Sequence, residues 1–164
     1  MATWLNGNAG VYRVEDVNGV MVDVLPEASV ESFSDLSGCG FTNQGGVVFA
    51  PIGDKIVASV SVTGLASGNG AFVVPVESPA KGMYIQKVIT DPAADGDAPA
   101  EYTIPVVDTD GATVFTVPAR STSAIERYDI PSALTKNEIL DSDWTFTLTG
   151  IGEGNIVAVR VIFS

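Results

Sequence analysis

The chain contains no histidine, and Cys39 is the only cysteine among its 164 residues. Without histidine, neither a Ser-His-Asp triad nor a His-ligated zinc site can form. A single cysteine also excludes an intrachain disulfide. Cys39 stands between two glycines with no histidine to activate it, so we interpret it as a small structural residue rather than a nucleophile.

Positive charge is scarce as well, with 8 Lys and Arg against 20 Asp and Glu and a net charge of −12. Such a surface repels phosphate backbones and anionic lipids, so we expect neither nucleic-acid nor membrane binding. Charged residues make up only 17% of the chain, whereas about 25% is usual. A low charge content is typical of a β protein with outward Thr and Ser, or of a surface partly buried against other subunits.

Long apolar segments are also missing, since no run approaches the ~18 apolar residues of a membrane span. The start of the chain lacks the basic and apolar regions of a secretory signal peptide. We therefore expect the protein to be made and folded in the cytoplasm.

What the chain does contain is alternation of apolar and polar residues. The runs WTFTL (residues 144–148) and IVAVRVIF (residues 156–163) each place large apolar side chains at every second position, which is typical of strands with one buried face. Folding the two runs about residues 150–155 sets Leu148 opposite Val157, so we predict a closing hairpin at the centre of the core.

Further short strands follow the same pattern, separated by turns. Asn18-Gly19 and Asp108–Gly111 carry hairpin turn chemistry, and we expect a third hairpin to join residues 56–62 to residues 71–76. Strand signals recur roughly every 8–12 residues, which favours an all-β sandwich. We predict a jelly-roll-like β-sandwich of about ten short antiparallel strands, with one short helix at residues 132–140.

In domain terms, we interpret residues 1–10 as an N-terminal arm and residues 11–164 as a single β-sandwich domain. Residues 27–46 read as a long irregular loop, and loops of that length often contact a partner. One face of the last strand carries two isoleucines and only one charge, so we expect it to be covered. The predicted interface residues are Trp4, Leu5, Phe33, Leu36, Phe41, Ile156 and Ile162.

Carboxylates are the remaining candidates for chemistry. A glycosidase needs two acids that face each other across a bond, but neither the Asp141 and Asp143 pair nor the Glu126 and Asp129 pair can be brought together from sequence. We predict no enzymatic activity and no cofactor.

Calcium is the one ligand that the acidic residues favour. Asp91, Asp95, Asp97 and Glu101 cluster in one Pro- and Gly-containing stretch, and flexible loops of carboxylates suit Ca²⁺. Their spacing is not that of an EF-hand, so a solvated acidic turn is the favoured interpretation and calcium binding is the alternative.

An acidic, Gly-, Thr- and Val-rich β protein without a signal peptide or disulfides resembles the small β-rich structural proteins of tailed-phage virions. The resemblance covers the whole chain in character and rests on no specific motif. It implies a non-enzymatic capsid decoration or cement protein, located in the virion, that forms a homo-oligomer such as a trimer and binds the major capsid protein or other virion proteins. The alternative is a carbohydrate- or receptor-binding β-sandwich, for example the head of a fibre or tail. A minor head or tail structural protein is a further possibility.

Overall fold

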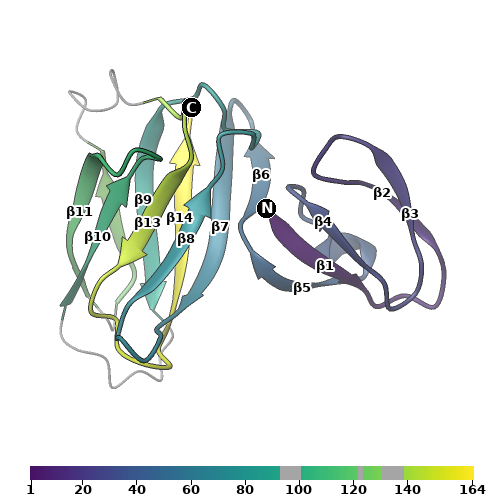
Figure 1. The fold of residues 1–164 in the computed structure, drawn as a ribbon, viewed down its shortest axis with the longest axis horizontal. Helices are drawn as coiled ribbons and strands as arrows, with labels where there is room; N and C mark the ends of the chain where they lie inside the picture. The colour runs from purple at the N-terminus through teal and green to yellow at the C-terminus, as the bar shows by residue number, and fades with distance from the viewer. Residues whose placement is uncertain (93–100, 122–123, 131–138) are drawn as a thin grey trace.

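The computed structural model describes residues 1–92, 101–121, 124–130 and 139–164, and within them the chain is built almost entirely of strands (Figure 1). Nine strands form two antiparallel sheets that pack face to face. The four-stranded sheet has the order β11-β10-β13-β8, with β8 at Gly70–Val74, β10 at Glu101–Val107, β11 at Thr113–Ser121 and β13 at Trp144–Leu148. The five-stranded sheet has the order β12-β9-β14-β7-β6, with β6 at Val48–Ile52, β7 at Lys55–Thr63, β9 at Ile85–Pro92, β12 at Glu126–Asp129 and β14 at Ile156–Phe163. The prediction of an all-β sandwich is confirmed.

Residues 1–46 form a second unit beside the sandwich, which we call the small lobe. Its three-stranded sheet has the order β4-β1-β5, with β1 at Ala2–Asn6, β4 at Ser29–Ser32 and β5 at Phe41–Gly46. A separate hairpin joins β2 (Tyr12–Glu15) to β3 (Met21–Val24), and a 3₁₀ turn η1 spans Ser37–Cys39. The lobe has its own buried cluster, Ala2, Trp4, Val14, Val24, Val30, Leu36 and Phe41.

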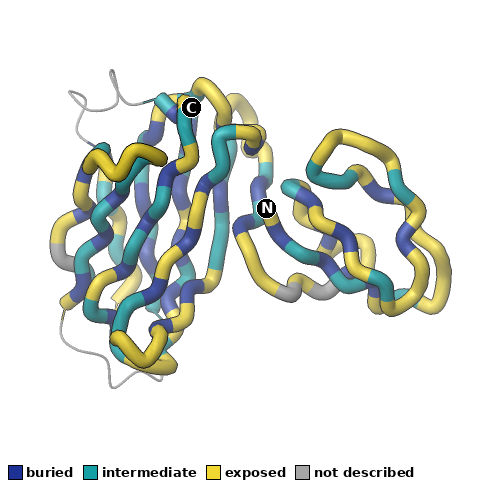
Figure 2. Tube along the Cα trace, viewed as in Figure 1, coloured by how far each residue is buried: buried dark blue, intermediate teal, exposed yellow. Residues whose placement is uncertain are grey.

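The main core lies between the two sheets of the sandwich (Figure 2). The large apolar residues of 144–148 are at most 1% exposed, and those at 157, 159, 161 and 163 are at most 2% exposed. The predicted alternation of faces is therefore correct.

The predicted pairing of these two strands is wrong. β13 pairs with β8 and β10, whereas β14 pairs with β7 and β9. The 150–155 segment crosses from one sheet to the other, so Leu148 and Val157 belong to opposite layers of the core. The same correction applies to residues 56–62 and 71–76, because β7 and β8 also lie in different sheets. Period-two patterning identifies which face of a strand is buried, but not which strand is its neighbour.

The predicted hairpins at Asn18-Gly19 and Asp108–Gly111 are confirmed by the β2–β3 and β10–β11 pairs. Residues 27–46 are not a structureless loop, since β4, η1 and β5 lie within them. Most of the predicted helix, residues 132–138, falls outside the described residues, and Ile139 forms a β-bridge with Tyr84. No helix in the described ranges has the length and apolar character needed to cross a membrane.

The N-terminal residues form a strand rather than an arm. β1 is the central strand of the lobe sheet and pairs with β4 on one side and β5 on the other. Its pairing with β5 brings the backbones close at Gly46, where φ is +98° and a β-carbon would collide with the Met1 carbonyl oxygen. The predicted division of the chain into residues 1–10 and a single domain of residues 11–164 stays a prediction.

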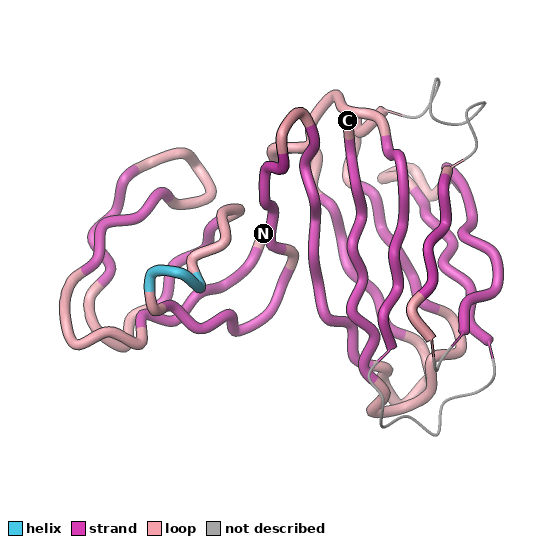
Figure 3. Tube along the Cα trace, turned by 180° about the vertical axis from the view of Figure 1, so that it is seen from behind, coloured by secondary structure: helices cyan, strands magenta, loops and turns pink. Residues whose placement is uncertain are grey.

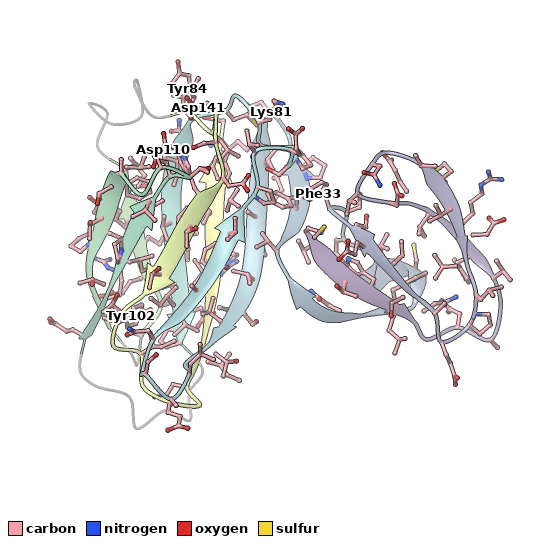
Figure 4. All side chains as sticks on the ribbon, in the orientation of Figure 1. Phe33, Lys81, Tyr84, Tyr102, Asp110 and Asp141 are labelled. Atoms are coloured by element: carbon pink, nitrogen blue, oxygen red, sulfur yellow. The ribbon has the colours of Figure 1, made fainter. Side chains whose placement is uncertain are left out.

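The lobe is joined to the sandwich along the edge strand β6, as seen from behind in Figure 3. The Phe49 N–H donates to the Phe33 carbonyl at 2.8 Å, and the two rings meet edge to face with centroids 5.6 Å apart. Figure 4 labels Phe33 at this seam. The Val47 N–H also donates to the Met1 carbonyl at 2.9 Å, so the lobe covers the first part of β6, whereas Ile52 at its other end is 63% exposed.

Candidate functional site

A groove of about 470 Å³ lies between the small lobe and the outer face of the five-stranded sheet. Because Val157, Val159 and Val161 of β14 point into the core, the intervening Ala158 and Arg160 point outward. They form the floor of the groove together with outward residues of β6, β7 and β9. The lobe supplies the facing wall, from β1, β5 and the segment around η1.

Small side chains make up the part of the groove floor beside Arg160 and Asp91. Ala158 pairs with Ser61 on one side and Asp91 on the other, and Arg160 pairs with Ser59. Serine and alanine rise little above the pleat, so a ligand on this floor can approach the sheet closely. The cross-strand pairs at each end of the floor have larger side chains, because Ile162 pairs with Val57 and Ile156 pairs with Thr63. The floor is therefore low around Ala158, Ser59 and Ser61, between Ile156 on one side and Arg160 on the other.

The lobe wall is held in place by local hydrogen bonds. The Asp35 carboxylate accepts from the Ser37 N–H at 2.9 Å. Hydrogen bonds from the Ser37 hydroxyl and backbone hold the pKa of Asp35 below its ordinary value. In β5 the Asn43 side-chain oxygen accepts from the Gly45 N–H at 2.7 Å. The Asn43 NH₂ group has no acceptor among the described residues, so it is available to a ligand.

The groove offers both donors and acceptors that the described part of the chain leaves unused. Arg160 is exposed and forms no ion pair there, so its guanidinium can donate to a ligand. Asp91 can accept, and the hydroxyls of Ser59 and Ser61 can do either. The charged residues that line the groove are two carboxylates and one guanidinium, so negative charge is in slight excess there.

Four of the seven predicted interface residues pack against other residues of the same chain. Trp4, Leu36 and Phe41 are buried in the lobe core, and Phe33 packs at the seam. Leu5 is half-buried. On the sheet, Ile156 is 46% exposed and Ile162 is half-buried, and both flank the groove floor. A contact of any of these seven residues with another subunit stays a prediction.

The predicted calcium ligands are only partly within the described structure. Asp91 lies near the end of β9 and Glu101 begins β10, while Asp95 and Asp97 fall outside the described residues. Within the described ranges no three acidic or cysteine side chains gather closely enough to hold a metal ion. Calcium binding stays a prediction.

Three of the four carboxylates considered for catalysis, Asp143, Glu126 and Asp129, have structural partners. The Asp143 carboxylate accepts from the Val76 N–H at 2.7 Å. The Glu126 carboxylate lies 3.5 Å from the Arg120 guanidinium, and the Asp129 carboxylate lies 2.8 Å from the Lys87 ammonium group. Glu126 and Asp129 are three residues apart on β12, so strand alternation points them to opposite faces. They cannot converge on one bond.

The groove itself was not visible in the sequence. Its wall comes from residues 4 and 35–43, and its floor comes from residues 48–61, 91 and 158–160. One clue was present, because Arg160 is the single charge on an outward face that also carries two isoleucines. An isolated arginine in such a row is a candidate binding residue.

No family model matches the chain, and no curated protein matches it. Among solved structures, it is similar to family 29 carbohydrate-binding modules. One variant of such a module has a TM-score of 0.38 and 16% identity over 80% of this chain and 88% of that chain. A second variant, complexed with cellulohexaose, has a TM-score of 0.37 and 14% identity over 72% of this chain and 75% of that chain. At these TM-scores and identities the likeness carries no argument about function.

Proposed function

We propose that the protein is a non-catalytic carbohydrate-binding module and that its ligand, a neutral saccharide, lies in the groove between the small lobe and the five-stranded sheet. The observation that carries the proposal is a set of polar groups over a low floor that have no partner among the described residues: the Arg160 guanidinium, the Asn43 NH₂ and the Asp91 carboxylate. The groove volume of about 470 Å³ falls within the range of ligand sites, about 300–1,000 Å³.

A saccharide fits this lining because each sugar hydroxyl both donates and accepts. Arg160 and Asn43 donate, Asp91 accepts, and serine hydroxyls adapt to either need. The low floor of alanine and serine leaves room for a ring to lie along the strands. A polyanionic ligand suits the site less, because Asp35 and Asp91 share the groove and the net charge is −12.

A structural role on a tailed-phage virion, with a capsid protein as partner, stays a prediction. The two roles are compatible, because a module that binds surface glycans can itself be a component of a virion. The saccharide proposal is favoured because it uses the polar groups that the groove brings together.

A glycan array tests the proposal. We expect the unaltered protein to bind a restricted set of neutral glycans. Ser61→Trp places an indole on the groove floor and abolishes that binding by filling this part of the groove. The matched control is Thr116→Trp, at an exposed strand position of the other sheet, and it leaves binding unchanged. Absence of binding to any glycan, or equal binding by both variants, contradicts the proposal.

A further inference from the structure

The β2–β3 hairpin lies at the end of the small lobe farthest from the sandwich (Figure 1). The outer edge of β2 is occupied at its C-terminal end, because the Ser32 hydroxyl donates to the Glu15 carbonyl at 2.9 Å and the Val17 N–H donates to the Glu31 carbonyl at 3.0 Å. β3 pairs with β2 alone among the described strands. Its second edge is therefore open.

The backbone groups on that edge can be assigned. The Asp16 N–H donates to the Val20 carbonyl at 2.9 Å, so this pair is hydrogen-bonded. Hydrogen-bonded pairs alternate along an antiparallel ladder, and the next one falls at Val22. The N–H and C=O groups of Met21 and Asp23 consequently point away from β2, toward the open edge.

This edge carries exposed apolar side chains, and Asp23 is the one charged residue in the four-residue strand β3. Val20, Met21 and Leu25 are 54%, 50% and 60% exposed. Proteins commonly blunt an open edge with lysine, proline or a bulge inside the strand, and Met21–Val24 contains neither lysine nor proline. An open apolar edge of this kind is a template for another strand.

We propose that β3 pairs antiparallel with β3 of a second copy of the chain, about a two-fold axis at Val22. In this register the backbone N–H and C=O groups of Met21 pair with those of Asp23 in the second copy. The two-fold axis repeats this pair, so Asp23 of the first copy pairs with Met21 of the second. This register also sets Val20 opposite Val24 of the second copy, on the face that each hairpin turns toward its own lobe core, where Val24 is only 4% exposed. The two hairpins then form one continuous four-stranded sheet.

Neighbouring registers that also satisfy the backbone are less favourable. Centring the axis on Asp23 sets two aspartates directly opposite each other, which is destabilising. Centring it on Met21 sets Asp23 opposite Gly19 and leaves Val24 without a valine partner. The sequence is therefore self-complementary in the Val22 register, and this is why the occupant is a second copy rather than an unrelated strand.

The pairing is independent of the saccharide proposal, although it has a consequence for it. A two-fold dimer carries two grooves, and linked weak sites bind a multivalent surface more tightly than single sites.

Charge variants at Met21 test both the dimer and its register by sedimentation velocity over a wide range of protein concentration. We expect the unaltered chain to dimerise. Met21→Lys faces Asp23 of the second copy twice by symmetry and tightens the dimer roughly fivefold, whereas Met21→Asp weakens it by at least as much. Leu65→Lys, at a 65% exposed position of the sandwich, is the control for the change in net charge.

A backbone variant adds a second test. Met21→Pro removes an N–H that points away from β2, so it abolishes the dimer while the β2–β3 pair survives, and Met21→Ala keeps both. An unaltered chain that is monomeric at every concentration overturns the proposal. So does a result in which Met21→Lys and Met21→Asp weaken association alike, since simple burial of an apolar patch would give that outcome.

Discussion

Replacing Asn6 with alanine is expected to destabilise the small lobe selectively. Asn6 is completely buried, although it is polar. Its NH₂ group donates to the carbonyls of Val24 at 2.9 Å, Gly10 at 3.0 Å and Leu25 at 3.1 Å. Its oxygen accepts from the backbone and side-chain nitrogens of Asn8, both at 3.0 Å. One side chain thus ties β1 to the end of β3 and to the turn that follows β1.

The magnitude follows from these contacts. Two N–H hydrogens serve three carbonyls, and two further hydrogen bonds are accepted, which gives four effective hydrogen bonds. At about 1 kcal/mol net for each, Asn6→Ala lowers the free energy of unfolding of the lobe by about 4 kcal/mol. Asn6→Asp keeps the size of the side chain but puts a carboxylate oxygen, which only accepts, where the NH₂ group faces three carbonyls. It is therefore expected to lower the free energy of unfolding by at least as much.

The two tryptophans allow the lobe and the sandwich to be followed separately. Trp4 is buried in the lobe core and Trp144 in the sandwich core. Urea unfolding is followed by fluorescence in a Trp144→Phe background for the lobe and in a Trp4→Phe background for the sandwich. Asn6→Ala is expected to move the Trp4 transition to a much lower urea concentration and the Trp144 transition much less.

A milder neighbouring change is the control. Asn8→Ala leaves the three carbonyl contacts of Asn6 in place and removes two bonds of the Asn8 side chain, to the Asn6 oxygen and to the Cys39 carbonyl. About half the effect of Asn6→Ala is therefore expected. The reasoning is refuted if Asn6→Ala leaves the lobe within about 1 kcal/mol of the unaltered chain, or if both tryptophan transitions shift equally.

Three further predictions concern the sandwich. Phe146→Ala removes a fully buried ring that stacks on the Phe72 ring, with centroids 4.8 Å apart. Urea titration should show that the free energy of unfolding falls by about 3–5 kcal/mol. Burial raises the pKa of the Tyr102 phenol; the unfolded chain therefore loses this proton first as pH rises above the ordinary tyrosine pKa, and stability falls there. Tyr102→Phe should flatten this alkaline decline in the urea midpoint, whereas Tyr84→Phe, at an exposed position, should not. At Gly64 a β-carbon would collide with a backbone carbonyl of the loop after β13, while at Gly10 it would meet nothing, so Gly64→Ala should lower the melting temperature and Gly10→Ala should not.

Strand faces were predictable because alternation is local. Residues 144–148 and 156–163 each show which side chains are buried, and the structure agrees. The neighbouring strand was not predictable, because a glycine-rich segment such as 150–155 can close a hairpin or cross between two sheets. Both outcomes bury the same side chains, so the apolar pattern does not distinguish them.

The small lobe was missed for a different reason. In β1 the buried positions are Ala2, Trp4 and Asn6, so only one large apolar residue marks the buried face of the strand. Asn6 is buried because it satisfies backbone carbonyls, and such a partnership is invisible before the chain is folded. The segment 27–46 is similarly rich in polar residues, and its strands are held by pairing with β1.

The groove depends on long-range placement. Asp35, Asn43 and Arg160 meet only because the lobe stands over the sheet beside β6. No local spacing connects residues that lie more than a hundred positions apart in sequence.

Titration calorimetry with the best glycan from the array tests the central claim most directly. Arg160→Ala removes a charged donor from the groove floor and should weaken binding by about 2 kcal/mol, roughly thirtyfold in the dissociation constant. Arg127→Ala, an exposed arginine of β12 in the same sheet but outside the groove, should leave the dissociation constant unchanged. Equal affinities of the Arg160 variant and the unaltered protein would contradict the claim that the saccharide lies in this groove.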